Sequence, residues 1–287
     1  MEGAMTASSR DGSPMRSAGR AWVIARTDLR QLRRSRDFWM PLVIVAALFY
    51  MVIPLVLFTT ITSIRSQDFA RELGDVVRVL PDSIEDDLEG AGPEDQIAYA
   101  LAVYLFAPLA IVVPVTVSSA IGSHTLIGER ERGSGEFLAH SPASEREIFL
   151  GKALAALLPG YATAAVGFTV YSLIVNITIG PGVGGWFFPT TNWLVLMGWV
   201  VPPFLVLVVA LILSISARVT SAAAAQQASA LVTLPLIVLA YGFSTQSLAS
   251  ARTWGGLVGL VSWIAAIAAL WRGIRSVRRE RLLGLGG

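Results

Sequence analysis

Few residues of this sequence could carry out covalent chemistry. The chain has no cysteine, which excludes thiol nucleophiles, thiolate metal sites and disulfides. Two histidines, His124 and His140, are too few for an imidazole metal site, so no metal is expected. The turn at residues 133–135, Gly-Ser-Gly, superficially resembles the turn around a nucleophilic serine, but only His140 lies nearby and no acid is fixed to orient it. We therefore expect no catalytic residue.

A nucleotide site is the second chemistry to consider, because Lys152 follows Gly151. A phosphate-binding loop would also need glycine at position 146, where Arg146 stands. The sequence thus predicts no cofactor in this chain, and any ATP and magnesium that power it must be bound by another protein. The net charge of +2 does not suggest nucleic-acid binding.

The composition points to a membrane protein. Apolar residues make up 54% of the chain and charged residues 15%, against about 25% charged in soluble domains. Six runs lack Asp, Glu, Lys and Arg, and each can cross a hydrocarbon core of about 30 Å as a helix. The runs are 38–64, 97–128, 153–179, 193–217, 221–249 and 253–271. They show no alternation of apolar and polar residues, so we predict an all-α integral membrane protein with six transmembrane helices.

The distribution of basic residues predicts the orientation. The N-terminal segment 1–37, the second and fourth connections and the tail 272–287 carry 18 of the 22 Lys and Arg residues. The positive-inside rule therefore places both termini in the cytoplasm. The loop 65–96, with ten acidic and three basic residues, is expected on the outer side, and its role is open.

Neutral polar residues and prolines interrupt the predicted spans. The polar residues that could either line a pore or join helices are Thr116, Ser119, Asn176, Gln226 and Gln227. The prolines that could serve as hinges or as static kinks are Pro54, Pro108, Pro114, Pro202, Pro203 and Pro235. No Asp, Glu, Lys or Arg lies inside a span, which disfavours an ion-driven carrier.

The segment 18–32 predicts an amphipathic helix before the first span. Its apolar face comprises Ala18, Ala21, Trp22, Ala25, Leu29 and Leu32. Arg30, Arg33 and Arg34 lie largely off that face. Such a helix is expected to lie along the inner leaflet with its arginines on anionic head groups, although a basic flank that only sets the topology would look the same.

The second connection, residues 128–152, predicts a short cytoplasmic hairpin. The second helix is expected to continue through Glu129 to Arg132, and Gly133 and Gly135 then break it. One helical turn can follow at residues 136–140, before Ser141-Pro142. The pair Ser144 and Glu147 has the spacing of a capping box that begins the third helix.

These residues resemble a known family. The stretch ERERGSGEFLAHSPASEREIFLGK resembles the signature loop of ATP-binding-cassette (ABC) exporter permeases of the type-2 class. The matching residues are Glu129, Arg130, Glu131, Gly133, Glu136, Leu138, Pro142, Ile148, Gly151 and Lys152. Ser134, Gly135 and Phe137 depart from the commoner Thr, Leu and Leu. The segments 25–39 and 225–235 are similar to the family's connecting helix and fifth span.

The resemblance implies a permease half that pairs with a second half, either itself or a paralogue, and with two ATPase subunits. The residues expected to couple to the ATPase are Glu129, Arg130, Glu131, Arg132, Gly133, Glu136, Phe137, Leu138 and Pro142. Export across the cell membrane is implied by the family alone, and the neutral spans suit an amphiphilic or hydrophobic substrate. The alternatives are an uncoupled channel or scaffold subunit and, as a weaker third class, a membrane enzyme.

Overall fold

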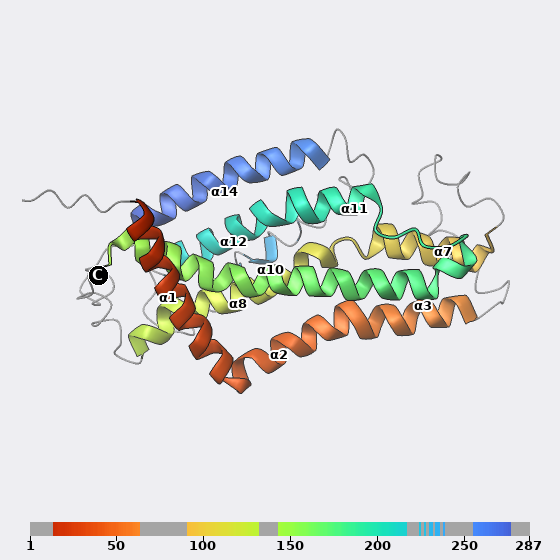
Figure 1. The fold of residues 1–287 in the computed structure, drawn as a ribbon, viewed down its shortest axis with the longest axis horizontal. Helices are drawn as coiled ribbons and strands as arrows, with labels where there is room; N and C mark the ends of the chain where they lie inside the picture. Colours follow the sequence, from red (N-terminus) through yellow and green to blue (C-terminus); the bar gives the residue numbers. More distant parts are fainter. Residues whose placement is uncertain are drawn as a thin grey trace, which may run out of the picture.

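The computed structural model describes residues 14–63, 91–131, 143–216 and 255–276, together with single positions between 224 and 238. Every regular element in these ranges is helical (Figure 1). The first described helix is α1 (Pro14–Arg34), which precedes the first apolar run. Four helical stretches in the described part are long and apolar enough to cross a membrane, or five when one bent pair is counted as a span.

Five of the six apolar runs correspond to these stretches. The first run corresponds to α2 (Arg36–Ala47), η1 (Leu48–Val52) and α3 (Ile53–Ser63). The second corresponds to α7 (Pro93–Ala100), η3 (Leu101–Leu105) and α8 (Leu109–Glu131). The third run corresponds to α10 (Glu145–Thr178), which is followed by the short η4 (Gly180–Gly182). The fourth corresponds to α11 (Thr191–Val195), η5 (Leu196–Val200) and α12 (Val201–Ser216), and the sixth to α14 (Gly256–Ser276). The run 221–249 lies largely outside the described residues, so the six-helix count stays a prediction.

The second span is interrupted near Pro108, one of the prolines at which the sequence predicts a hinge or a kink. Its two pieces are bent by 41° at the break that includes Pro108. Proline has no amide hydrogen and its ring crowds the preceding turn, so it removes a backbone hydrogen bond.

Two other spans contain a wider, π-helical turn just before a proline. The segment η1 ends two residues before Pro54, and η5 ends two residues before Pro202. Insertion of a π turn is one way in which a helix accommodates a missing hydrogen bond. In contrast, Pro114 lies inside the continuous α8. The prolines thus differ in their local effect, and three of the six predicted bends coincide with an irregular turn.

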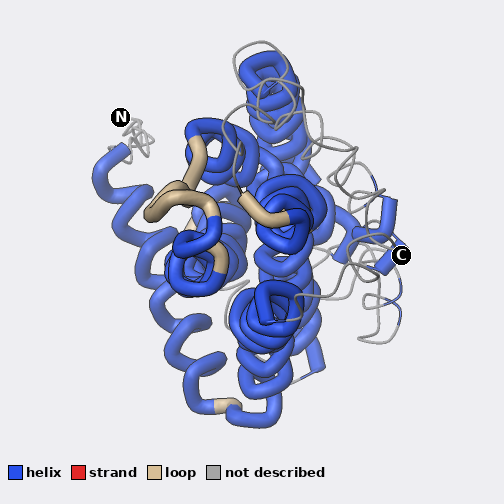
Figure 2. Tube along the Cα trace, turned by 90° about the vertical axis from the view of Figure 1, so that its right-hand side faces the viewer, coloured by secondary structure: helices blue, strands red, loops and turns tan. Residues whose placement is uncertain are grey.

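The spans form a bundle, and α1 lies across one end of it. In Figure 1 the long helices follow the longest axis of the molecule, whereas α1 crosses them, and Figure 2 shows α1 lengthwise beside helices that are seen nearly end-on. The helix α10 packs against α8, α12 and α1. Fully buried side chains between the spans include Ile111, Phe204 and Ile212. The bundle therefore has two distinct ends, one carrying α1 and the other carrying the loop after α10.

Candidate functional site

The end of the bundle that carries α1, which we call the α1 end, brings the N-terminal helix onto the beginning of α10. Ala21 and Ala25 are buried against the bundle and Leu32 packs on its core. Trp22 is 49% exposed and Leu29 is half-buried, so the docked face is rotated from the predicted apolar face. The reason is that α1 docks through its smallest side chains, which allow the closest approach.

Gly151 is the point of closest approach between the two helices. A β-carbon at this position would lie 2.7 Å from Cβ of Ile24 and 2.9 Å from the carbonyl oxygen of Ala21. Contacts this short do not occur between real side chains, so only glycine fits without a shift of α1. The glycine of the resembled Gly-Lys pair thus has a structural purpose, which is to seat α1.

A buried ion pair lies one residue further along α10. The ammonium Nζ of Lys152 lies 3.0 Å from Oδ2 of Asp28 and donates a hydrogen bond of 3.2 Å to Oδ1. The Lys152 side chain is 1% exposed, so the pair is shielded from water. Burial raises the pKa of the Asp28 carboxyl, and the attraction to the Lys152 ammonium opposes that shift. A buried pair of this kind is costly to break from one side, because the remaining charge is left without a partner.

A second ionic contact lies at the start of α10. Ser144 and Glu147 form the predicted capping box, in which the Glu147 backbone N–H donates to Oγ of Ser144 and the Ser144 N–H donates to Oε2 of Glu147. The same carboxylate lies 3.5 Å from Nη1 of Arg20 on α1. The first turns of α10 and the docked face of α1 are therefore joined by two ionic contacts and should move together.

The predicted coupling residues precede this joint in the chain. Glu129, Arg130 and Glu131 form the end of α8, as expected for a second helix that extends into the charged segment. Their side chains lie outside the described residues, as do all atoms of the remaining coupling residues. Those residues are Arg132, Gly133, Glu136, Phe137, Leu138 and Pro142. Of the predicted basic residues on α1, Arg30, Arg33 and Arg34 are exposed.

The opposite end of the bundle, which we call the loop end, contains Asn176. Its side-chain amide donates to the carbonyl oxygen of Phe188 at 2.6 Å, and its Oδ1 accepts from the backbone N–H groups of Phe187 and Phe188 at 3.0 Å each. Asn176 is buried, and these bonds hold the loop after α10. The Asn176 side-chain amide is therefore occupied by hydrogen bonds to the backbone of this loop.

The other neutral polar residues that were predicted to line a pore or join helices differ in burial and in hydrogen-bond partner. The hydroxyl of Thr116 donates to the carbonyl of Val112 in its own helix. Ser119 is buried and accepts a hydrogen bond from Thr233 at 3.3 Å, so a residue of the fifth run lies beside α8. Gln227 is exposed, whereas Gln226 lies outside the described residues.

Sequence reasoning did not single out Asp28, Glu147 or the Asp28–Lys152 pair as a site. A signal was present, since Asp28 stands seven residues after Ala21 and therefore on the same helix face, and the chain has one lysine. An acid on the docked face of an arginine-rich helix needs a buried cation, and Lys152 provides it. The contact itself could not be read from two positions so far apart in the chain.

Most of the chain matches the model of a known protein family. The family model described as ABC-2 family transporter protein matches residues 22–279, which include most of α1, the connection 129–142 and all the described spans. Comparison with individually curated proteins gives no match. The match and the apolar helices together establish a multi-pass membrane protein. The chain therefore belongs to the ABC-2 family of transporter proteins, as the membrane permease of an ABC transporter that associates with an ABC ATPase.

Proposed function

We propose that this chain is one permease half of an ABC exporter, driven by ATP that separate subunits hydrolyse. The observation that carries the proposal is the joint between α1 and the start of α10, formed by Asp28, Lys152, Arg20 and Glu147. It lies immediately after the connection 129–142 that resembles the family's coupling loop. A push on that connection would reach α1 and α10 together.

The proposed path of motion runs from the coupling connection into the spans. Closure of the ATPase subunits displaces the segment 136–140, and the joint passes the displacement to α10. This helix has 34 residues and extends to the loop end, where Asn176 holds the following loop. The irregular turns before Pro54 and Pro202 are where the neighbouring spans can bend. The spans then alternate between inward-facing and outward-facing packing.

The remaining components belong to partners. ATP and magnesium bind to two ATPase subunits, and this chain has neither a nucleotide site nor an enzymatic role of its own. A second permease half, identical or paralogous, completes the pathway. Both termini lie in the cytoplasm, and α1 rests on the inner leaflet of the cell membrane with the half-exposed Trp22 toward lipid. The substrate is amphiphilic or hydrophobic, in keeping with spans that carry neutral side chains.

The coupling role is tested by the double substitution Glu136→Ala and Phe137→Ala. The variant complex should lose its ATPase subunits during purification in mild detergent, or keep them without stimulated ATP hydrolysis. The control is Trp186→Ala, because Trp186 is highly exposed at the loop end and far along the chain from the connection. Transport that persists unchanged with a bound ATPase would remove the coupling role.

An uncoupled channel or scaffold subunit is the competing function. It predicts that no ATPase is recovered with the chain and that activity survives changes in the connection. Mass spectrometry of the complex purified through the full-length chain distinguishes the two functions, because it identifies any companion with a phosphate-binding loop.

A further inference from the structure

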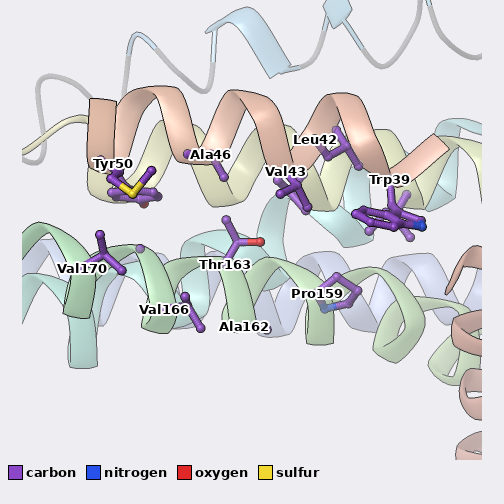
Figure 3. A pocket seen from close by; sticks show the side chains of 15 residues that line it. Trp39, Leu42, Val43, Ala46, Tyr50, Pro159, Ala162, Thr163, Val166 and Val170 are labelled. Atoms are coloured by element: carbon purple, nitrogen blue, oxygen red, sulfur yellow. The ribbon is translucent and has the colours of Figure 1, made fainter. Parts of the chain in front are cut away.

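An open apolar groove lies between the first and third spans, near the α1 end. It has a volume of about 420 Å³ and is lined by α2 and η1 on one side and by α10 on the other, with part of α8 as its floor. Figure 3 shows Trp39 and Pro159 at one end of the groove and Tyr50 and Val170 at the other. Small residues line both sides, among them Ala46 on α2 and Ala162 on α10, and they leave the space open.

The dimensions of the groove suit a single extended hydrocarbon chain. From Trp39 to Met51 the helix rises about 18 Å at 1.5 Å per residue, close to the roughly 15 Å depth of one leaflet. The side chains that line the groove are apolar apart from single polar atoms on Trp39, Tyr50 and Thr163, which suits a hydrocarbon chain.

The Trp39 end of the groove is positively charged. Arg36 stands three residues before Trp39 on the same face of α2, and Val43 continues that face one turn later. The side chains of Arg33, Arg34 and Arg36, three to six residues before Trp39 in the chain, are all exposed. Between residues 30 and 39 the sequence has four arginines and one aspartate. Tryptophan beside arginine is the arrangement expected at the level of lipid head groups.

We propose that this groove is a binding site for an anionic phospholipid of the leaflet next to α1. One acyl chain lies between α2 and α10, from Trp39 to Met51, and Arg33 and Arg36 bind the phosphate-containing head group. The proposal rests on membrane insertion of the spans and goes beyond the proposed coupling role, so it stands whether or not an ATPase acts on the connection.

The test compares lipid binding by native mass spectrometry of the intact complex, with phosphatidylglycerol and phosphatidylcholine of equal chain length as probes. The wild type should retain phosphatidylglycerol more strongly. Ala162→Leu fills the groove and should weaken binding of both lipids, whereas Ala268→Leu, at an exposed alanine of α14, should not. Monodisperse elution of each variant confirms that it is folded.

The head-group contact is tested separately. Arg33→Ala with Arg36→Ala should weaken phosphatidylglycerol binding roughly tenfold or more and leave phosphatidylcholine binding nearly unchanged. The control is the double substitution Arg26→Ala with Arg272→Ala, which removes the same amount of charge elsewhere. It should have little effect on the binding of either lipid.

Two results would overturn the proposal. One is equal lipid retention by the Ala162→Leu and Ala268→Leu variants, which would mean that lipid binds elsewhere. The other is efficient disulfide-linked dimerisation of Val43→Cys in the otherwise cysteine-free chain, which would mean that a second copy covers the groove.

Discussion

The two ends of the bundle are held together by different chemistry. At the α1 end, α1 is joined to α10 by the charged pair Asp28 and Lys152 and by the contact between Arg20 and Glu147. At the loop end, neutral groups bind backbone atoms, as when the Tyr171 hydroxyl donates to the carbonyl of Ala102 at 2.7 Å. Loss of one partner costs more at a buried ion pair than at a neutral bond to backbone, because an unpaired buried charge is less favourable than an unpaired buried polar group.

Aromatic packing adds to the difference. The rings of Tyr171, Phe188 and Trp193 have centroids 5.0 to 5.6 Å apart, and the indole of Trp193 donates to the carbonyl of Val103 at 2.9 Å. Ala102 and Val103 belong to η3, just before the break in the second span. The loop end is thus held by aromatic packing and neutral hydrogen bonds around an interrupted helix, and the α1 end is where the proposed coupling would let motion enter.

The largest effect is expected from Lys152→Met. It leaves the Asp28 carboxylate buried and unpaired, which should lower the free energy of unfolding by about 3–5 kcal/mol. The free energy can be measured by titration with a denaturing detergent. Release of α1 can be followed by maleimide labelling of Ala25→Cys, because Ala25 is fully buried and the chain has no other cysteine.

The matched control is the double variant Asp28→Leu with Lys152→Met, which removes both charges. It should regain most of the lost stability, because apolar residues commonly replace a buried ion pair without net cost. Equal destabilisation of the single and double variants would show that the charges do not hold α1.

A smaller loss is expected at the loop end from Asn176→Leu. The change leaves buried backbone groups of the loop without their partner and should cost about 1–3 kcal/mol. The same detergent titration measures it. Altered substrate selectivity at unchanged stability would instead assign Asn176 to the transport pathway.

Gly151→Ala tests the close approach at the α1 end. The added β-carbon must displace Ile24 or the backbone of Ala21, which should cost about 1–3 kcal/mol and speed the labelling of Ala25→Cys. The matched control is Gly19→Ala on α1, where a β-carbon meets nothing within 4 Å. That change should strengthen the helix by up to about 1 kcal/mol. Equal stability and equal labelling rates for the Gly151→Ala and Gly19→Ala variants would argue against tight docking of α1 on α10.

The smallest effect is expected from Trp193→Phe. It keeps most of the aromatic packing and removes the indole hydrogen bond to the carbonyl of Val103, at a cost of about 0.5–1.5 kcal/mol. Thermal unfolding measures the change. A loss of unfolding free energy as large as that of Lys152→Met would show that the two ends do not differ in their sensitivity to substitution.

The sequence predicted the spans better than the site. The first run, 38–64, corresponds closely to Phe38–Ser63, because continuous apolar composition marks a membrane helix directly. The capping pair Ser144 and Glu147 predicted the start of α10, although the charge-free run begins only at 153. Local signals of this kind need no knowledge of neighbours.

Contacts between distant segments were harder to predict. The pairing of Asp28 with Lys152 and the loop contacts of Asn176 depend on which helices pack together, and polarity alone does not reveal this. The rotation of α1 that leaves Trp22 half exposed has the same origin. The family resemblance predicted the membership, which the family match confirmed, and the coupling role of the connection 129–142 stays a prediction.

The most direct test of the account measures ATP hydrolysis by the reconstituted complex in the Lys152→Met and Asn176→Leu variants, at a temperature where both remain folded. The account predicts that Lys152→Met abolishes most of the permease-stimulated hydrolysis, because α1 and α10 no longer move together, whereas Asn176→Leu retains it. Equal stimulation by the two variants would contradict the claim that work enters the bundle at the α1 end.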